Sequence, residues 1–328
     1  MLRELTIRNR SLPLHSPFRI SRGVKHAADV VTVELTQGNC TGRGESVPYA
    51  RYGESVASVL DVIEALRKDL CAGMGRDELQ ARLSPGAARN AVDAALWDLD
   101  ARLCHVPVWT QLARPARAPL VTALTISLDT PDAMEKAASR IADAKLIKIK
   151  VDADDPVARI EAVRLAAPSA RLIVDPNESW TIGILRGVLP ALERAGVNLV
   201  EQPLPAMADG DLVGFSSRIP ICADESCHTS ADLPRLLDRY HAINIKLDKT
   251  GGLTEAWRML RAARAQGFRI MVGCMVGSSL GIAPALEIAR EAEFIDLDGP
   301  LWLENDHADG VKLQDGLLAP PASGFWGS

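Results

Sequence analysis

Five short apolar runs in this chain each end on a charged residue, and these charged residues recur at a nearly constant interval. They are Lys150, Asp175, Glu201, Asp224 and Lys246, separated in turn by 25, 26, 23 and 22 positions. That interval is about the length of one strand, one helix and two loops in a (β/α)8 barrel. We therefore expect the five charges to be neighbours around one ring.

The runs themselves have the character of buried parallel strands. They are short and rich in β-branched residues, and helix-length stretches separate them, as a parallel sheet covered by helices requires. The five runs lie at 146–150, 172–175, 197–201, 219–224 and 242–246. Three more runs keep the interval, at 121–126, 269–273 and 293–297. The sequence therefore predicts an α/β fold in which eight strands form a (β/α)8-type barrel.

Length and charge narrow the class of protein further. The chain has 328 residues, which exceeds a bare barrel of about 250 residues by enough for a small extra domain. A net charge of -5 offers no basic patch, so nucleic acid is not an expected partner. We also expect no membrane partner and a cytoplasmic location, because no apolar stretch reaches membrane-spanning length and residues 1–8 lack the apolar core of a signal peptide. The six cysteines form no Cys-x-x-Cys pair, which favours neither a disulfide nor a zinc framework.

The first part of the chain has a different pattern from the barrel. Residues 2–8 and 30–35 alternate apolar and polar side chains, which is typical of antiparallel strands with one solvated face. Between Ala88 and Leu103 the apolar residues follow the spacing of an amphipathic helix. We therefore predict an α+β capping domain at 1–112, the barrel at 113–305, and a C-terminal segment, 306–328, that packs back on the cap.

Three of the five charges are carboxylates on successive strands. Asp175, Glu201 and Asp224 would meet at the carboxyl ends of the strands, where the active sites of such barrels lie. One carboxylate at the end of a strand is ordinarily a helix cap or a loop residue, but like charges held this close repel unless a cation neutralises them. An all-oxygen ligand set suits Mg²⁺ better than zinc. The pattern predicts a magnesium site.

Lysines flank these carboxylates on both sides. Lys148 and Lys150 share one face of a strand because side chains alternate, and Lys246 lies four strands further on, across the barrel. We expect the cation and the neighbouring ammonium groups to lower the pKa of a lysine towards neutrality, as a general base requires. Two opposed bases around one carbon suffice to invert a stereocentre.

With these motifs the chain resembles the enolase superfamily, and within it the muconate lactonizing enzyme subgroup. The matching segments are Lys148-Ile149-Lys150, Asp175-Pro176-Asn177, Glu201-Gln202-Pro203, Asp224-Glu225-Ser226 and 244–252. The resemblance implies Mg²⁺ bound by Asp175, Glu201 and Asp224, with Lys150 and Lys246 as the acid/base pair around an enediolate. It also implies that Lys148 is a supporting cation that contacts the substrate carboxylate. Asn177 and Glu225 would support the ligands without binding the metal.

The eighth strand carries a second acidic pair. Asp296 and Asp298 would lie on one face at the mouth of the barrel by the same alternation. A turn before Gly299 is the alternative explanation, since Asp is common in turns. Asp-x-Asp at this position resembles dipeptide epimerases, in which the pair holds the free α-ammonium of the substrate. Charge supports the same interpretation, because two more anions beside three carboxylates need a cationic ligand group.

Two segments of the cap resemble the lid loops of dipeptide epimerases, at 18–23 and 44–55. In relatives that act on Ala-Glu, a cation of the first loop meets the glutamate side chain. This implies a substrate contact for Arg22, less so for Arg19 or Lys25, although plain surface charge is an alternative for each. Many relatives carry an acidic residue after strand seven, whereas residues 273–279 here read Gly-Cys-Met-Val-Gly-Ser-Ser. That departure leaves the detail of the substrate open.

The resulting hypothesis is a Mg²⁺-dependent isomerase that epimerises small dipeptides such as L-Ala-L-Glu and L-Ala-D-Glu, in peptidoglycan peptide metabolism. Related alternatives are an N-acylamino acid racemase, an o-succinylbenzoate synthase and a muconate cycloisomerase. From other classes, the alternatives are a barrel whose lysine forms a Schiff base and a catalytically silent binding protein. The second would be expected to lose one of the five ring residues, and none is lost. A homo-oligomer is left open as well, closed symmetric assemblies being the common case.

Overall fold

The computed structural model describes residues 2–314 and 316–328, and in this part of the chain eight parallel strands follow one another in sequence order. The strands are β4 (Leu124–Ile126), β5 (Leu146–Lys150), β6 (Arg171–Asp175), β7 (Val197–Glu201), β8 (Ile221–Ala223), β9 (Ala242–Ile245), β10 (Arg269–Gly273) and β11 (Phe294–Asp296). The two edges meet, because the backbone N–H of Ala123 donates to the carbonyl oxygen of Ile295 at 2.7 Å. The predicted (β/α)8, or TIM, barrel is confirmed, although β4 and β11 are shorter than the apolar runs that contain them.

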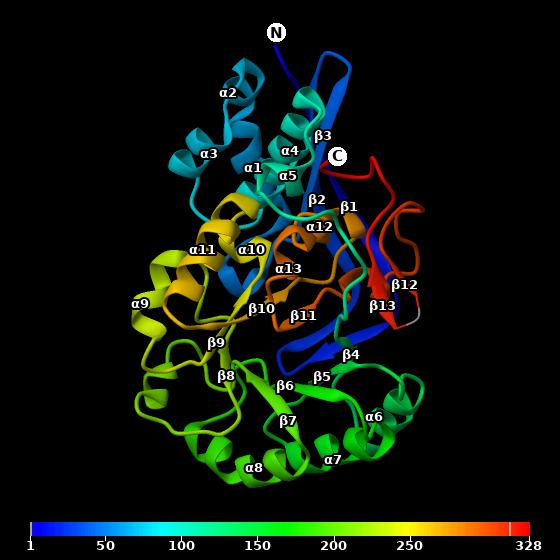
Figure 1. Ribbon diagram of the computed structural model, residues 1–328, viewed down its shortest axis with the longest axis vertical. Coiled ribbons are helices and arrows are strands. Elements are labelled where there is room, and N and C mark those ends of the chain that lie inside the picture. Colours follow the sequence, from blue (N-terminus) through cyan, green and yellow to red (C-terminus); the bar gives the residue numbers. More distant parts are fainter. Residues whose placement is uncertain (1, 315) are drawn as a thin grey trace.

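Helices cover the outside of the barrel, in the lower half of Figure 1. The longer ones are α6 (Pro131–Ser139), α7 (Pro156–Ala166), α8 (Ile182–Arg194) and α11 (Leu253–Ala265). Short turns complete the ring: η2 (Asp209–Leu212), η3 (Ser230–Asp232), α9 (Leu233–Leu236), α10 (Leu247–Thr250), α12 (Ser279–Ile282), α13 (Leu286–Ala289) and η4 (Gly299–Trp302). Thr130, Asp155 and Thr181 begin α6, α7 and α8 by accepting a hydrogen bond from the first turn, as N-cap residues do.

The inside of the barrel changes from apolar to polar along the strands. Its floor is a buried apolar layer to which every strand, or the segment leading into it, contributes one residue: Ala123, Leu146, Ile173, Leu199, Cys222, Ala242, Met271 and Phe294. Side chains alternate along a strand, so the next inward positions belong to Lys148, Asp175, Glu201, Asp224 and Asn244. The polar groups therefore lie at the carboxyl ends of the strands, above a sealed floor.

The cap is an antiparallel sheet with helices against it, in the upper half of Figure 1. Its elements are β1 (Glu4–Ile20), β2 (Gly23–Gln37), β3 (Cys40–Ser46), η1 (Ala50–Tyr52), α1 (Val56–Ala65), α2 (Arg67–Ala72), α3 (Arg76–Arg82), α4 (Ala87–Cys104) and α5 (Val108–Gln111). The strands run well beyond the predicted segments. A register irregularity between Pro13 and Phe18 interrupts the β1–β2 hairpin, and such irregularities bend a strand. The tip of the hairpin, residues 21–22, reaches the barrel mouth.

Helix α4 differs from its expected amphipathic character, because four of its polar residues are buried: Arg89, Asn90, Asp93 and Asp98. The cap sheet packs on one side, where a Cβ added to Gly44 would lie 2.1 Å from the carbonyl oxygen of Ala91. The barrel packs on the other side, where Nδ2 of Asn90 donates to Oδ1 of Asp248 at 2.8 Å. Hydrogen bonds to the barrel thus satisfy polar groups that the helical pattern assigned to solvent, and α4 joins the two domains.

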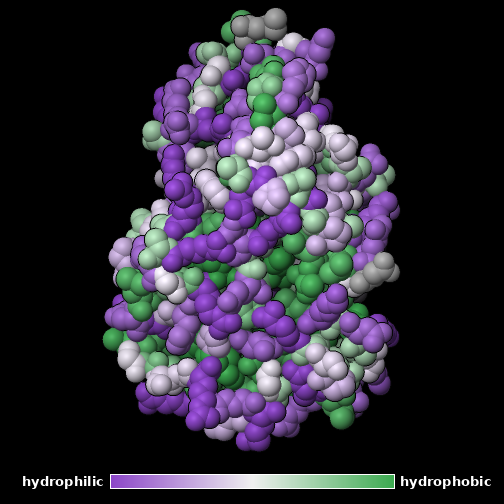
Figure 2. All heavy atoms as spheres, viewed as in Figure 1, coloured by the Kyte–Doolittle hydropathy of each residue, from purple (hydrophilic) through white to green (hydrophobic). Residues whose placement is uncertain are grey.

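The C-terminal segment contains the hairpin β12 (Lys312–Gln314) and β13 (Leu317–Ala319) and then contacts the cap. The buried indole of Trp326 donates to the carbonyl oxygen of Arg43 at 2.9 Å, and the N–H of Gly327 donates to Asp98 at 2.7 Å. On the face seen in Figure 2 hydrophilic residues predominate, and apolar residues gather mainly over the barrel half. In the described part of the chain no helix is both long and apolar enough to cross a membrane.

Candidate active site

The barrel mouth brings the five charged residues together as the sequence predicted. Lys150, Asp175 and Glu201 are the last residues of β5, β6 and β7, while Asp224 and Lys246 directly follow β8 and β9. All five are at least nine-tenths buried. Three of them, Lys150, Asp224 and Lys246, line a cavity of about 450 Å³. Its wall also includes Phe18, Arg22, Tyr49, Lys148, Cys274, Asp296 and Asp298. This cavity is the candidate active site.

Lys148 lies at the base of the cavity among three carboxylates. Its Nζ atom is 3.0 Å from Oδ2 of Asp175, 2.6 Å from Oε2 of Glu201 and 2.7 Å from Oδ2 of Asp296. Burial lowers the pKa of Lys148, but these carboxylates raise it by more, so the net shift is well upward. Lys148 is therefore a fixed cation that ties β5, β6, β7 and β11 together.

Lys150 and Lys246 face the cavity from strands on opposite sides of the barrel. Lys150 donates to Oδ2 of Asp175 at 2.6 Å, and Lys246 donates to Oδ2 of Asp224 at 2.7 Å. Burial lowers the pKa of Lys246, yet Asp224 and Glu201 raise it by more. The expected lowering towards neutrality is thus not what the protein groups produce, because the facing carboxylates outweigh the neighbouring ammonium groups.

The three predicted metal ligands differ in their electrostatic surroundings. Burial raises the pKa of Asp175 and Asp224, but the paired lysines lower both by more. The pKa of Glu201 is raised, by burial and then by the charge of Asp175. Glu201 is therefore the one of the three whose surroundings disfavour the ionised form.

The fit of a divalent cation depends on the free oxygens of this ring. Among the described residues no three His, Cys, Asp or Glu side chains converge closely enough to hold a metal, since ammonium groups lie between the carboxylates. Oε2 of Glu201 and Oδ1 of Asp224 are buried, and each forms an ion pair at 2.6 Å, with the ammonium groups of Lys148 and Lys249 respectively. Each oxygen has a further lone pair that can bind a cation. Buried anionic oxygens with spare acceptor capacity, in an all-oxygen set, suit Mg²⁺.

Three supporting residues were missed as site residues in the sequence. Asn244 donates to Oε1 of Glu201 at 2.8 Å, and Oε1 of Gln202 accepts the backbone N–H of Asp224 at 2.8 Å. The third, Lys249, lies 2.6 Å from Oδ1 of Asp224. Alternation along β9 could have identified Asn244, which precedes Lys246 by two positions. Gln202 and Lys249 follow the ends of their strands, where alternation no longer applies.

Asn177 and Glu225 lie beside the metal-ligand candidates, as expected. Oδ1 of Asn177 accepts a hydrogen bond from Lys150 at 3.2 Å, and its backbone N–H donates to Oδ1 of Asp175 at 2.9 Å. The φ of Asn177 is 46°, a left-handed value that Asn tolerates better than most residues. Glu225 instead faces the lid, where its Oε1 lies 2.7 Å from Nη2 of Arg22.

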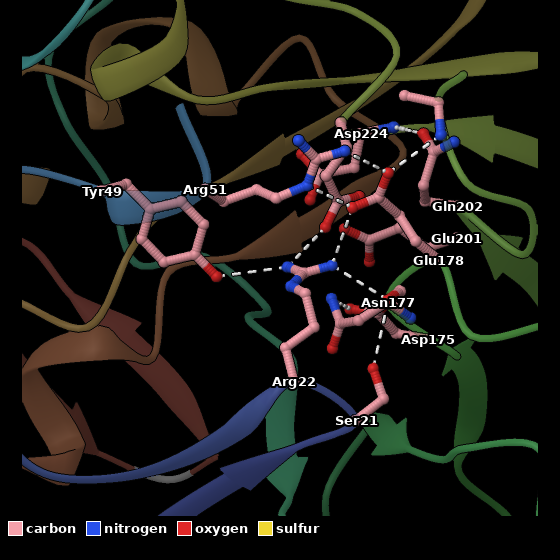
Figure 3. A network of polar contacts seen from close by, with 12 residues as sticks. Ser21, Arg22, Tyr49, Arg51, Asp175, Asn177, Glu178, Glu201, Gln202 and Asp224 are labelled. Atoms are coloured by element: carbon pink, nitrogen blue, oxygen red, sulfur yellow. Dashed lines mark hydrogen bonds and ion pairs between the residues drawn. The ribbon is translucent and has the colours of Figure 1, made fainter. Parts of the chain in front are cut away.

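The two lid loops are tied to the barrel by arginines (Figure 3). Arg22 donates to the carbonyl oxygen of Asn177 at 2.9 Å and to Oε2 of Glu178 at 3.1 Å. Arg51, from the second loop, binds both oxygens of Glu178 at 2.8 Å each. Arg22 therefore reaches the cavity wall, but with its guanidinium engaged by barrel residues.

The two other cations of the first lid loop lie differently. Arg19 pairs with Asp129 at 3.3 Å, and both side chains are exposed. The ammonium of Lys25 lies 4.9 Å from the ring centre of Tyr49 and lines the cavity. Arg22 is the one of the three that contacts the barrel carboxylates Glu178 and Glu225.

Asp296 and Asp298 form an acidic wall of the same cavity. Oδ1 of Asp296 is buried and accepts no hydrogen bond from the residues that the structure describes. Oδ2 of Asp298 accepts from the N–H of Thr125 at 2.7 Å and from the indole of Trp302 at 3.3 Å. Burial, with the nearby charge of Asp296, raises the pKa of Asp298 to about 6. A cationic group at this wall would relieve that repulsion.

Strand β10 contributes no side chain at its end. A Cβ on Gly273 would lie 2.7 Å from Oδ1 of Asn244 and 3.1 Å from Cε of Lys246, so a larger residue would displace both. The following residues, Cys274 to Val276, line the cavity instead. The segment after β10 therefore supplies a largely apolar part of the cavity wall.

Known proteins resemble this chain along almost its whole length. The enolase C-terminal domain-like family matches residues 132–325, and the N-terminal domain of the mandelate racemase / muconate lactonizing enzyme family matches residues 2–112. The L-Ala-D/L-Glu epimerase of Escherichia coli (strain K12) is 46% identical over 97% of this chain and 99% of that protein. An N-acetyl-D-glutamate racemase from Pseudoalteromonas sp. is 45% identical over 91% and 95%.

Solved structures give the same grouping. An enolase family member from Agrobacterium tumefaciens with homology to dipeptide epimerases, with bound sodium and L-Ala-L-Glu, superposes with a TM-score of 0.97 at 48% identity over 99% of this chain and 100% of that one. The dipeptide epimerase of Enterococcus faecalis V583, complexed with Mg and L-Leu-L-Tyr, has a TM-score of 0.90 at 28% identity over 98% and 97%. The chain belongs to the mandelate racemase / muconate lactonizing enzyme family of the enolase superfamily.

Proposed function

We propose that this protein is a Mg²⁺-dependent dipeptide epimerase, an isomerase that interconverts L-Ala-L-Glu and L-Ala-D-Glu or similar dipeptides. The observation that carries the proposal is one cavity in which lysines on opposite strands, Lys150 and Lys246, share the wall with the acidic pair Asp296 and Asp298. Opposed lysines suit proton transfer on both faces of one carbon. The acidic pair suits a substrate with a free ammonium group.

Asp175, Glu201 and Asp224 are the residues that would hold Mg²⁺. The buried oxygens of Glu201 and Asp224 and the raised pKa of Glu201 support this assignment, because a divalent cation would stabilise the ionised form of Glu201. When bound, the metal would stabilise the negative charge that develops on the substrate carboxylate. Lys148, a buried cation beside Glu201, would stabilise the same charge, and Asn177 and Glu225 would hold the neighbouring groups in place.

Lys150 and Lys246 would carry the proton steps. One lysine removes the α-proton of the second residue as a neutral amine, which leaves an enediolate, and the other, as an ammonium, returns a proton to the opposite face. The roles exchange in the reverse direction. Each lysine rests against its own carboxylate, Asp175 or Asp224, so its position is set independently of the other.

The remaining contacts would select the dipeptide. Oδ1 of Asp296 has spare acceptor capacity and lies at the wall that Asp298 shares, so the pair would bind the α-ammonium. Arg22 lines the cavity and would meet a carboxylate side chain on the second residue, exchanging part of its contact with Glu178 or Glu225. The preference for Ala-Glu rests on that contact.

Several broader assignments are proposals as well. We retain the division into a capping domain at 1–112, a barrel at 113–305 and a C-terminal segment at 306–328. We also propose a cytoplasmic enzyme of peptidoglycan peptide metabolism, with the dipeptide as its small-molecule partner. A homo-oligomer is compatible with this function, since closed symmetric assemblies are common among soluble proteins.

Proton exchange tests the function directly. Incubation with Mg²⁺ and L-Ala-L-Glu in D₂O is expected to place deuterium at the α-carbon of the second residue only, with L-Ala-D-Glu formed in parallel. NMR spectroscopy follows both events. Removal of the metal by EDTA should stop both, and Mg²⁺ should restore them. Absence of exchange across a broad dipeptide library would contradict the proposal.

Racemisation of an N-acylated glutamate is the second candidate, favoured by the identity to the N-acetyl-D-glutamate racemase. The variant Asp298→Asn separates the two. For a dipeptide, loss of one of two charges facing the ammonium is expected to lower kcat/KM by about 10- to 100-fold, about the cost of a charge-assisted hydrogen bond. An N-acetyl substrate has no ammonium and should lose little or gain. Equal losses of kcat/KM on both substrates would show that Asp298 does not bind the ammonium group.

A further inference from the structure

Glu45 is a buried carboxyl group that the proposed reaction does not use. It lies on β3 of the cap and is 2% exposed. Its pKa is raised to about 7, first by burial and also by the charges of Asp248 and Asp306, although hydrogen bonds from Ser278 lower it. A buried carboxyl group among other carboxylates is costly to maintain. Its contacts therefore indicate what it contributes.

Both oxygens of Glu45 bind one residue of the barrel. Oε1 accepts the backbone N–H of Ser278 at 2.8 Å, and Oε2 accepts the Ser278 hydroxyl at 2.6 Å. Two glycines make room for the carboxyl group. A Cβ on Gly277 would lie 3.3 Å from Oε1 and one on Gly281 would lie 3.0 Å from it. The segment after β10 is thus shaped around a side chain of the cap.

The segment that Glu45 holds is also a wall of the cavity. Cys274, Met275 and Val276 line the cavity four to two residues before Ser278. They pack closely on the turn after Asp298, since a Cβ on Gly299 would lie 2.6 Å from the carbonyl oxygen of Met275 and 3.0 Å from Sγ of Cys274. A shift of Ser278 would therefore move the wall beside the acidic pair.

We propose that Glu45 is a positioning residue that holds loop 274–278 as the wall against which the first residue of the dipeptide packs. The proposal rests on the proposed function, in which Asp296 and Asp298 bind the ammonium of that residue. Its side chain leaves the same carbon as the ammonium, so it must fit beside this wall. Glu45 would thereby limit the size of the first residue without touching the substrate.

The matched variants Glu45→Ala and Glu45→Gln test the proposal. Gln keeps both contacts, because its amide oxygen accepts the Ser278 N–H and its amide N–H donates to the hydroxyl. For Glu45→Ala we expect KM for L-Ala-L-Glu to rise about tenfold with kcat nearly unchanged. This is the pattern when a change weakens binding of the substrate and of the transition state equally. The ratio of kcat/KM for L-Ala-L-Glu to that for L-Leu-L-Glu should fall about tenfold, within the range by which the shape of an apolar pocket discriminates between side chains. Glu45→Gln should resemble the wild type.

Hydrogen–deuterium exchange gives a readout that does not depend on activity. Peptides that contain residues 274–278 should exchange faster in Glu45→Ala than in Glu45→Gln or the wild type. Should Glu45→Ala fail to fold, Ser278→Ala, which removes one of the two contacts, should show smaller changes in the same directions. Unchanged selectivity and unchanged exchange, or a fall in kcat alone, would overturn the proposal.

The same measurements separate this inference from the proposed function. If the wild type is inactive on every dipeptide while the loop exchanges faster in Glu45→Ala, both the proposed function and the substrate subsite are wrong. The contact between Glu45 and Ser278 is then only structural. An active wild type whose Glu45→Ala variant keeps its selectivity would remove only the role of Glu45.

Discussion

Replacement of either Lys150 or Lys246 by alanine is expected to lower the rate of epimerisation by about 1,000-fold, within the range that general acid/base catalysis contributes. Each lysine faces the cavity from its own side and rests against its own carboxylate, so neither can replace the other. Steady-state kinetics with L-Ala-L-Glu and with L-Ala-D-Glu measures the loss in both directions.

Isotope exchange makes this prediction sharper. A variant that keeps one base can still remove the α-proton from one epimer and return deuterium to the same face. Lys150→Ala and Lys246→Ala should therefore each retain exchange for a single epimer, and for opposite ones. The matched control is Lys136→Ala, which removes an exposed lysine of α6 and should leave the kinetics unchanged. Loss of exchange for the same epimer in both variants would contradict a two-base reaction.

Much of the fold and of the charged ring could be predicted because both depend on regular spacing. The interval between Lys150, Asp175, Glu201, Asp224 and Lys246 is the length of one βα unit, and the alternation of side chains aimed Lys148 into the barrel. These rules hold inside strands. They also account for the apolar floor beneath the charges.

Residues beyond the strand ends were harder to predict. Asp298 follows the end of β11, and hydrogen bonds from Thr125 and Trp302, not alternation, fix its side chain. Likewise, Lys249 and Gln202 reach Asp224 from turns whose geometry no spacing rule describes.

Contacts between the domains were beyond prediction for a different reason. Arg22 meets Glu178 and Glu225, and Glu45 meets Ser278, across 150 residues or more of sequence. A pattern within one segment cannot show which distant carboxylate or amide a side chain will meet. The polar residues of α4 illustrate the same point, because Asp248 of the barrel binds Asn90, which the helical pattern assigned to solvent.

The variant Glu201→Gln is expected to lose affinity for Mg²⁺ by at least about 100-fold, because even the loss of a partner that only supports a metal ligand typically costs 10- to 100-fold. Gln has nearly the shape of Glu, and its amide oxygen can take the place of Oε2 beside the Lys148 ammonium. Its amide nitrogen can then donate to Oδ1 of Asn244 once the Asn244 amide turns over, because that oxygen accepts no hydrogen bond from the described residues. The change therefore removes the charge with little effect on packing. Isothermal titration calorimetry with Mg²⁺ measures the loss, and Glu193→Gln, on the exposed face of α8, is the matched control.

Thermal stability should respond to this substitution in opposite directions with and without the metal. A carboxyl group whose pKa is raised in the folded state binds its proton more tightly there than in the unfolded chain, so its contribution to stability falls as pH rises through the interval between the two pKa values. At neutral pH the ionised Glu201 is thus a cost that Gln removes. Without Mg²⁺ the variant should unfold at the same temperature as the wild type or at a higher one.

With Mg²⁺ the order should reverse. At a concentration of about 100 times its Kd, the metal stabilises the folded wild type by about 2.7 kcal/mol, whereas the variant gains almost nothing at that concentration. Unfolding followed by circular dichroism at neutral pH, with EDTA and then with Mg²⁺, compares the two. A variant that is less stable than the wild type in EDTA, or that is stabilised by Mg²⁺ as strongly, would show that Glu201 serves packing and not the metal.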